Sequence, residues 1–253
     1  MHSSARGRSV SHRRSWLRAG AAGAGLLILW TAGAAIASGP AAKPASPRPR
    51  LQPPAAFLDF CAHQPAECEF EVEPAEPGGR LSEEAIRRVL FARYYWITDT
   101  GKALHQVPHG RGEPFVREIT HAAAAVPSDG DAMKTVERIN AQVNRRVRPV
   151  MDETLYGRDF WRLAMREEDG DCEDYALTKR KELIAAGIPS SALSLAIGLT
   201  ERREAHAVLL VATDHGDLVL DNLSAQIVPP RQAPYLWRGR QAPGHSMIWV
   251  AVT

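Results

Sequence analysis

Residues 170–187 read GDCEDYALTKRKELIAAG, and the predicted fold is built around this segment. Four of its residues recur at the spacing of one buried helix face: Tyr175, Ala176, Lys179 and Leu183. Gly187 and the nearby Pro189 are residue types that end helices. The pattern therefore predicts a helix over 172–186 that begins at Cys172.

Three short apolar runs follow this helix and predict strands: Leu193–Leu199, Ala207–Ala212 and Leu218–Leu220. Residues 214–217, with the sequence DHGD, predict a hairpin turn between the second and third of these strands. A further strand over 247–252 is expected to close the sheet.

Two more helices are predicted upstream. Ser82 and the two glutamates after it are a typical helix start, and this helix is expected to run to Trp96. Asp131 is expected to cap the second helix, whose buried face is formed by Met133, Val136, Ile139 and Val143. Residues 98–130, between the two, predict an irregular or inserted segment because they are rich in Gly, Pro and His. Helices followed by antiparallel strands are typical of an α+β fold.

The first 37 residues have the three parts of an export signal. Five arginines and no acidic residue precede an apolar run over 26–30, and residues 35–37 (AIA) form a cleavage site. An uncleaved membrane anchor is the alternative, and both readings place the body in the periplasm or outside the cell. Residues 38–56 predict a Pro/Ala-rich linker, so the folded domain is expected over 57–253.

The composition is that of an ordinary globular protein, with 45% hydrophobic and 24% charged residues in a chain of 253. The formal net charge is +2, but acidic residues outnumber basic ones once the first 37 residues are set aside. A mildly acidic body lacks the positive charge that nucleic-acid binding requires, so no nucleic-acid partner is expected.

The chain has three cysteines. Cys61 and Cys68 are close in sequence and are expected to form a disulfide in an oxidising compartment. Cys172 is left over. It is therefore buried and inert, paired between molecules, or a working thiol.

The position of Cys172 favours a working thiol. Unpaired N–H groups and the helix dipole at a helix start lower the pKa of a thiol, and the thiolate is the nucleophile. Such a nucleophile needs a base and a group that orients the base. His206 begins one predicted strand and Asp221 follows the next, so the hairpin brings both to the same region, although the register is only approximate. Taken alone, each of these residues has an ordinary structural explanation.

Six carboxylates occupy the eight positions around this thiol: Glu167, Glu168, Asp169, Asp171, Glu173 and Asp174. Acidic residues are favourable at a helix start, but their charge opposes formation of a thiolate. A bound cation removes this conflict, and closely spaced oxygen ligands suit Ca²⁺. We therefore predict a calcium site at Asp171 and Glu173.

These segments together resemble the bacterial transglutaminase-like cysteine proteinases. The resemblance is carried by residues 170–177 (GDCEDYAL), by HAVL at 206–209 and by LDN at 220–222, and it extends from about Phe57 to Asn222. The family's catalytic residues fall on Cys172, His206 and Asp221. Its calcium ligands fall on Asp171 and Glu173, with Asp174 as a further candidate.

The resemblance also implies a fold and a biological role. The family fold is transglutaminase- or papain-like, with the cysteine-bearing helix packed on an antiparallel sheet that carries the histidine and the aspartate. Its best-understood members are periplasmic, calcium-dependent proteases that cleave a surface adhesin, release cells from biofilms and are sequestered by an inner-membrane cyclic di-GMP receptor. The chain is therefore expected to be a periplasmic cysteine endopeptidase with an adhesin-type substrate. Residues 98–130 are longer than the corresponding connection in the family.

Two alternatives remain open from the sequence. The same catalytic residues also support transamidation, in which a lysine amine rather than water accepts the acyl group. A non-catalytic calcium-binding or receptor-docking module is the alternative outside enzymes.

Overall fold

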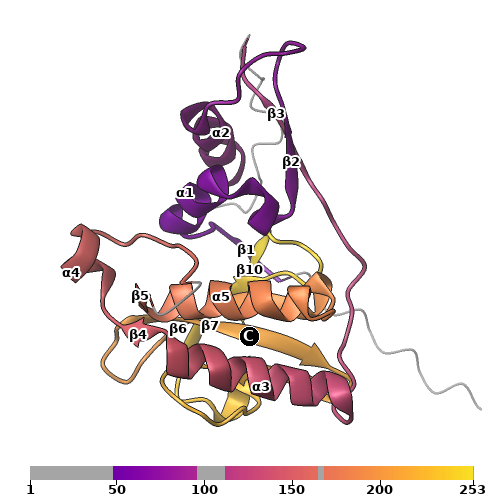
Figure 1. The fold of residues 1–253 in the computed structure, drawn as a ribbon, viewed down its shortest axis with the longest axis vertical. Helices are drawn as coiled ribbons and strands as arrows, with labels where there is room; N and C mark the ends of the chain where they lie inside the picture. The colour runs from indigo at the N-terminus through magenta and orange to yellow at the C-terminus, as the bar shows by residue number, and fades with distance from the viewer. Residues whose placement is uncertain (1–47, 96–111, 165–167, 253) are drawn as a thin grey trace, which may run out of the picture. The chain divides into compact units, whose positions relative to one another are not determined.

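The largest sheet of the protein has six strands (Figure 1). The computed structural model describes residues 48–95, 112–164 and 168–252. They belong to the second of two units, residues 46–253. The expected export signal over 1–37 lies outside the described residues, as do the first part of the expected linker and residues 98–111. Within the described residues, no helix is both long and apolar enough to span a bilayer.

The strands of this sheet are antiparallel and follow the order β1-β10-β9-β6-β7-β8. Their bounds are Arg50–Leu51 (β1), Leu193–Leu199 (β6), Ala205–Thr213 (β7), Gly216–Leu220 (β8), Leu236–Gln241 (β9) and Trp249–Ala251 (β10). The three strands predicted between 193 and 220 are thus confirmed. β9 had not been predicted, because its sequence LWRGRQ carries no clear apolar alternation.

The β7–β8 hairpin is tighter than predicted. Thr213 pairs with Gly216, so the turn is limited to residues 214–215 and β8 begins two residues before the expected Leu218. Gly216 has a φ of 109°, which a residue with a side chain adopts at a steric cost. This turn sets the register that pairs Leu209 with Leu220.

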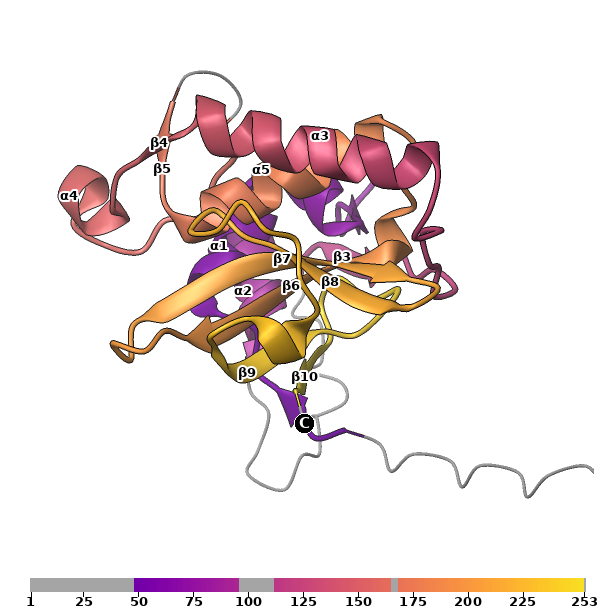
Figure 2. The ribbon, with the colours of Figure 1, turned by 90° about the horizontal axis from the view of Figure 1, so that it is seen from below.

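Two long helices lie side by side on one face of the sheet (Figures 1 and 2). These are α3 (Asp131–Arg146) and α5 (Cys172–Ala185), and both were predicted. The four apolar residues expected on the buried face of α3 are all buried. The predicted cap is wrong by one residue: Gly130 occupies the N-cap position and Asp131 is the first helical residue.

The remaining elements surround this core. The helices are α1 (Ala55–His63), α2 (Glu83–Leu90), the one-turn π-helix η2 (Phe91–Tyr95) and α4 (Asp152–Tyr156), with short 3₁₀ turns at 65–68, 190–192 and 230–232. Two small sheets pair β2 (Phe70–Glu73) with β3 (Phe115–Glu118) and β4 (Arg148–Pro149) with β5 (Asp169–Gly170). Ser82 caps α2 as predicted, because its side chain accepts a hydrogen bond from the Ala85 N–H.

Two sequence-based boundaries differ from the structure. The fold begins before Phe57, because Arg50 and Leu51 pair with β10 and α1 starts at Ala55. In addition, the later part of 98–130 is not irregular throughout, since β3 pairs with β2 and Val126 bridges to Thr213. Both segments are recruited by pairing with distant strands, which local sequence patterns do not reveal.

The sheet is buried on both faces. On the helix-covered face, β6, β7 and β8 contribute Leu195, Leu209, Val211 and Leu220 to the main core. On the opposite face, Ala196, Val208, Leu210 and Val219 form a smaller cluster against Ala233, Tyr235 and Trp237. β7 is therefore held from both sides, and it provides a rigid support for residues at its ends.

The predicted disulfide between Cys61 and Cys68 is present and joins α1 to the turn after it.

Replacing both cysteines with alanine should lower the free energy of unfolding by about 2–3 kcal/mol, because the unfolded chain gains conformational freedom. Urea unfolding measures this change. Dithiothreitol should shift the wild-type midpoint and leave the double variant unchanged; equal midpoints for both proteins without reductant would contradict the prediction.

Candidate active site

Cys172 is the first residue of α5 and is partly buried. Its Sγ accepts a hydrogen bond from the Ala207 N–H of β7 at 3.3 Å, and the thiol donates to Glu173 Oε2 at 3.1 Å. The first of these bonds ties the start of α5 to β7. The sulfur thus contacts Ala207, the residue after His206, and the thiol forms its hydrogen bond with Glu173 and not with the imidazole.

His206 and Asp221 meet as predicted. The imidazole Nε2 lies 2.9 Å from Asp221 Oδ1, and both side chains are 5% exposed. The Leu223 N–H donates to the same carboxylate oxygen at 3.0 Å, and the Tyr235 hydroxyl donates to Oδ2. Because Asp221 engages Nε2, the nitrogen left for accepting a proton is Nδ1.

The strand register explains why these residues meet. Alternation along β7 places His206 on the same face as Val208, which faces the smaller cluster containing Tyr235. Asp221 follows β8 directly, two residues after Val219 of the same cluster. β8 ends at Leu220, so its pairing with β7 stops at Leu209 and the start of β7 remains accessible to α5.

Tyr235 supports this pair, and its role was not predicted. Its ring lies 5.0 Å from that of His206, and burial raises the pKa of its hydroxyl, with the neighbouring Asp221 charge adding to the effect. The hydroxyl therefore remains a hydrogen-bond donor to the carboxylate. Nothing in the sequence around Tyr235 indicates this contact, because the segment between it and Asp221 carries only a β-bridge at Val228 and a 3₁₀ turn at 230–232.

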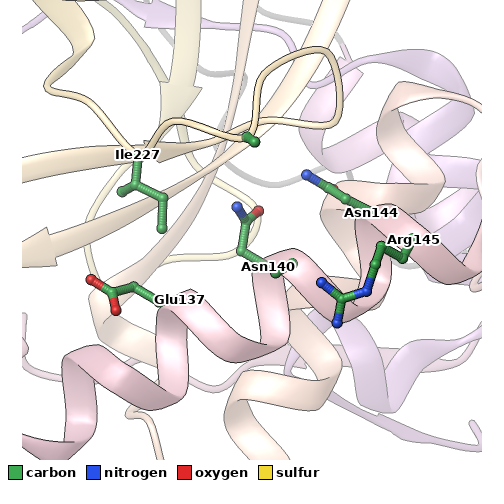
Figure 3. Close-up of a pocket in the computed structure, with 7 residues that line it drawn as sticks. Glu137, Asn140, Asn144, Arg145 and Ile227 are labelled. Carbon is green, nitrogen blue, oxygen red and sulfur yellow. The ribbon is translucent and has the colours of Figure 1, made fainter.

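α3 holds the backbone of Asp221. The Asn144 side-chain amide donates to the Asp221 carbonyl oxygen at 2.7 Å. A cavity of about 410 Å³ lies beside this contact, between α3 and residues 225–227, and Asn140 and Asn144 project from α3 towards that segment (Figure 3). Asn144 thus fixes the position of the segment that carries Asp221.

The expected low pKa of the thiol is not found. Burial raises the pKa of Cys172 well above its ordinary value, and the neighbouring Glu173 charge raises it further, whereas the Ala207 N–H acts in the opposite direction. The helix start therefore does not suffice to generate a thiolate beside these acids.

The carboxylates predicted to bind metal are joined by two that were not predicted. Asp152 is the first residue of α4, and Asp159 lies in the loop after it. The close carboxylates form two groups that share Asp152. One group is Asp152, Asp159 and Glu173, and the other is Asp152, Asp171 and Asp174. Within each group, the ligand atoms lie within 4.8 Å of one another. Asp171, the N-cap of α5, accepts a hydrogen bond from the Asp152 N–H at 3.2 Å instead of capping its own helix.

Three of these oxygens are buried without a hydrogen-bond partner: Asp152 Oδ1, Asp171 Oδ1 and Asp174 Oδ2. Burial raises the pKa of Asp152 to about 6, that of Asp174 to about 8 and that of Glu173 to about 10, and adjacent acids contribute to each shift. Arg162 is a nearby cation, with its Nε 3.7 Å from Asp174. Crowded carboxylates with free oxygens fit a hard divalent cation, which would replace the protons that the acids otherwise hold.

Gly170 makes room for this cluster. A Cβ at position 170 would lie 2.9 Å from both the Cβ and Oδ2 of Asp174. The Asp174 carboxylate also accepts a hydrogen bond from the backbone N–H of Arg162 at 2.8 Å.

The pairing of β5 with β4 brings residues 149–152 close to the start of α5, where the Asp152 N–H donates to Asp171.

Residues 116–253 match the sequence profile of the family described as bacterial transglutaminase-like cysteine proteinases. The chain belongs to this family. It is therefore a cysteine peptidase, a hydrolase that acts on protein substrates. The fold combines helices with an antiparallel sheet, as predicted.

Solved structures of LapG from Legionella pneumophila are similar to this proteinase. The calcium-bound form is 25% identical, with a TM-score of 0.43 over 49% of this chain and 72% of that chain. The EGTA-treated form is 24% identical, with a TM-score of 0.41 over 49% and 70% of the respective chains. No curated protein matches the chain.

The raised pKa values of the acidic cluster predict how stability varies with pH. Without a metal ion, folded Asp152 and Asp174 hold protons up to about pH 6 and about pH 8, whereas their unfolded pKa is 3.8. The folded state then binds more protons than the unfolded state, so stability falls as pH rises across this range. The melting temperature in EGTA should decline between about pH 5 and pH 8, and calcium should flatten this decline. A melting temperature in EGTA that rises with pH would contradict the prediction.

Proposed function

We propose that the chain is a periplasmic or secreted, calcium-dependent cysteine endopeptidase with Cys172 as nucleophile, His206 as base and Asp221 as the orienting acid. The observation that carries the proposal is the convergence of these residues. α5 places the thiol against Ala207 N–H, next to the His206–Asp221 pair, in a chain that belongs to a cysteine proteinase family.

The proposed reaction begins with proton transfer from Cys172 Sγ to His206 Nδ1. Asp221 holds the Nε2–H and thereby keeps Nδ1 available for this proton. The thiolate attacks the carbonyl carbon of the substrate peptide, and the imidazolium then donates its proton to the leaving amine. Water attacks the resulting thioester, with His206 taking its proton, and the cleaved acid is released.

The helix start also supplies hydrogen-bond donors. The Cys172 N–H lies in the first turn of α5, where N–H groups have no acceptor within the helix. We assign it as a donor to the oxyanion of the tetrahedral intermediate, whose negative charge forms beside the nucleophile. The Ala207 N–H serves a different purpose, since it donates to the sulfur itself.

Calcium is proposed as the cofactor of the acidic cluster. Asp152, Asp171, Glu173 and Asp174 would hold it, with Asp159 at the exposed side. When bound, the ion would supply positive charge that neutralises carboxylates next to the thiol. Glu173 would then no longer oppose formation of the thiolate, which its charge does in the metal-free protein.

The location and the substrate are further parts of the proposal. The export-signal pattern over 1–37 and the Cys61–Cys68 disulfide support an oxidising compartment outside the cytoplasm. The resemblance at residues 170–177 favours a cell-surface adhesin as the substrate, with a role in biofilm attachment. It also favours regulation by an inner-membrane receptor for cyclic di-GMP.

Replacing Cys172 with alanine should lower the rate of cleavage of surface proteins of the producing cell by about 10³-fold or more and leave the fold intact. Gel analysis of surface proteins and circular dichroism provide the two measurements. Cleavage by the C172A variant at the wild-type rate would overturn the mechanism.

The same digests distinguish hydrolysis from acyl transfer. Hydrolysis gives shorter fragments that gain one water at each cut, whereas transfer of the acyl group of a glutamine side chain to lysine releases ammonia and gives isopeptide-linked products without a cut. We expect fragments, in keeping with the proteinase family. Isopeptide-linked products alone would replace the proposal with transamidation.

Calcium should accelerate alkylation of Cys172 by iodoacetamide, measured by intact mass on the full chain. Cys172 is the free cysteine, because Cys61 and Cys68 are joined, so a single label reports it. The label should form faster with calcium than with EGTA and should persist below pH 7. Magnesium should not substitute, because its small octahedral shell fits a carboxylate cage poorly.

Asp152→Asn is the sharpest variant of this experiment, because it removes a carboxylate charge common to both groups. It should abolish the calcium effect while the thiol itself remains in place. Asp129→Asn is the matched control, an exposed aspartate outside both carboxylate groups. Equal calcium responses of the two variants would separate the acidic cluster from metal binding.

A further inference from the structure

Gly198 leaves a space in the sheet beside the proposed catalytic histidine. It lies in β6, where it pairs with His206 of β7 on one side and with Trp237 of β9 on the other. Residues that are directly opposite in antiparallel strands present their side chains on the same face of the sheet. A side chain at position 198 would therefore lie between those of His206 and Trp237.

Tyr235 fills this space. A Cβ on Gly198 would lie 2.9 Å from the Cβ of Tyr235 and 3.5 Å from Cε3 of Trp237. The Cβ of Tyr235 is bonded to its backbone, so it cannot turn away as the end of a flexible side chain could. The φ of Gly198 lies outside the left-handed region, so the backbone conformation does not require glycine here. The close approach of Tyr235 does require it.

The ring of Tyr235 is held between two other rings. Its centre lies 5.0 Å from that of His206, with the planes inclined by 37°, and 5.5 Å from that of Trp237 in an edge-on contact. Trp237 is fixed in turn, because its indole N–H donates to the Pro230 carbonyl oxygen at 3.0 Å. The phenol ring therefore packs against the imidazole from a defined direction.

The hydroxyl of Tyr235 contacts the other member of the pair. It donates to Asp221 Oδ2, whereas Oδ1 lies 2.9 Å from His206 Nε2 and accepts the Leu223 N–H at 3.0 Å. One side chain thus contacts both the imidazole and the carboxylate of a single hydrogen bond. His206 and Asp221 are each only 5% exposed beside it.

We propose that Tyr235 is a positioning residue that shelters the His206–Asp221 hydrogen bond from water and holds the second carboxylate oxygen, and that Gly198 provides the space this requires. The inference rests on the proposed catalytic triad and deepens it. Water competes for the donor and the acceptor of a hydrogen bond, so a sheltered bond is stronger and holds its geometry better. Asp221 would then orient the imidazole in one direction while Cys172 transfers its proton.

The test is the rate at which the His206 Nε2–H exchanges with water, measured by NMR on the ¹⁵N-labelled full chain without substrate. His206→Gln assigns the resonance. Tyr235→Phe keeps the ring and removes the hydroxyl, so the carboxylate loses a charge-assisted hydrogen bond and exchange should become about tenfold faster. A wild-type Nε2–H that exchanges too fast to be detected would overturn the proposal, because the pair would then not be sheltered.

Gly198→Ala tests the space beside the ring. Its Cβ should displace Tyr235 and accelerate exchange about tenfold, as loss of the hydroxyl does. If Gly198 acts through Tyr235, the double variant should exchange about tenfold faster than the wild type and not about a hundredfold faster. Unchanged exchange in Gly198→Ala, or effects of the two substitutions that multiply, would refute the role of Gly198.

Tyr175→Phe is the matched control for the tyrosine. It removes a hydroxyl that donates to the Val147 carbonyl oxygen at 2.6 Å, away from Asp221, so exchange of the His206 Nε2–H should stay at the wild-type rate. Unchanged exchange in Tyr235→Phe, or an equal acceleration in Tyr175→Phe, would overturn the proposal. A tyrosine with only a structural role would lower the melting temperature without changing this exchange rate.

Gly239→Ala is the matched control for the glycine. It makes the same substitution in the neighbouring strand β9, but its Cβ would contact Leu51 and not Tyr235. Exchange in this variant should match the wild type. None of these measurements needs proteolysis, so their outcome stays separate from a failure of the proposed peptidase activity.

Discussion

The hydrogen bond between the Ala207 N–H and the Cys172 sulfur is the contact on which the candidate site depends. It joins the first residue of a helix to a strand that is packed on both faces, so neither can shift without moving the other. His206 precedes the donor directly, and Asp221 follows the strand paired with β7. Cys172, His206 and Asp221 are therefore positioned by the packing of α5 on the sheet.

The second constraint is electrostatic. The same turn that presents Cys172 also presents Glu173 and Asp174, and the chain adds Asp152 from α4. These acids are buried, several of their oxygens are unpaired, and they oppose ionisation of the thiol. Under the proposal above, a bound cation would offset these charges, so metal binding would control the reactivity of the thiol.

The residues around Asp221 show how much support one carboxylate receives. Its two oxygens accept hydrogen bonds from His206, Tyr235 and the Leu223 N–H, and its carbonyl accepts one from Asn144. Every such bond reduces the freedom of the carboxylate and so the entropy lost when the imidazole is oriented.

The features that depend on local pattern could be predicted from consecutive residues. The helix at 172–185, the strand at 193–199 and the hairpin between β7 and β8 follow from apolar spacing and turn residues close in the chain. The motif at Cys172, together with the segments at 206–209 and 220–222, also indicated the family. These features need only short-range interactions, whose effect is written in consecutive residues.

The tertiary fold set the remaining features. Asp152 and Asp159 join the acidic cluster from a different segment, Tyr235 contacts Asp221 from 14 residues further along the chain, and Arg50 pairs with β10 at the edge of the sheet. It also decided the state of the thiol, which the helix start alone would have made acidic and which burial beside Glu173 makes less so. Burial and contact between distant residues set these properties, and both exist only once the chain has folded.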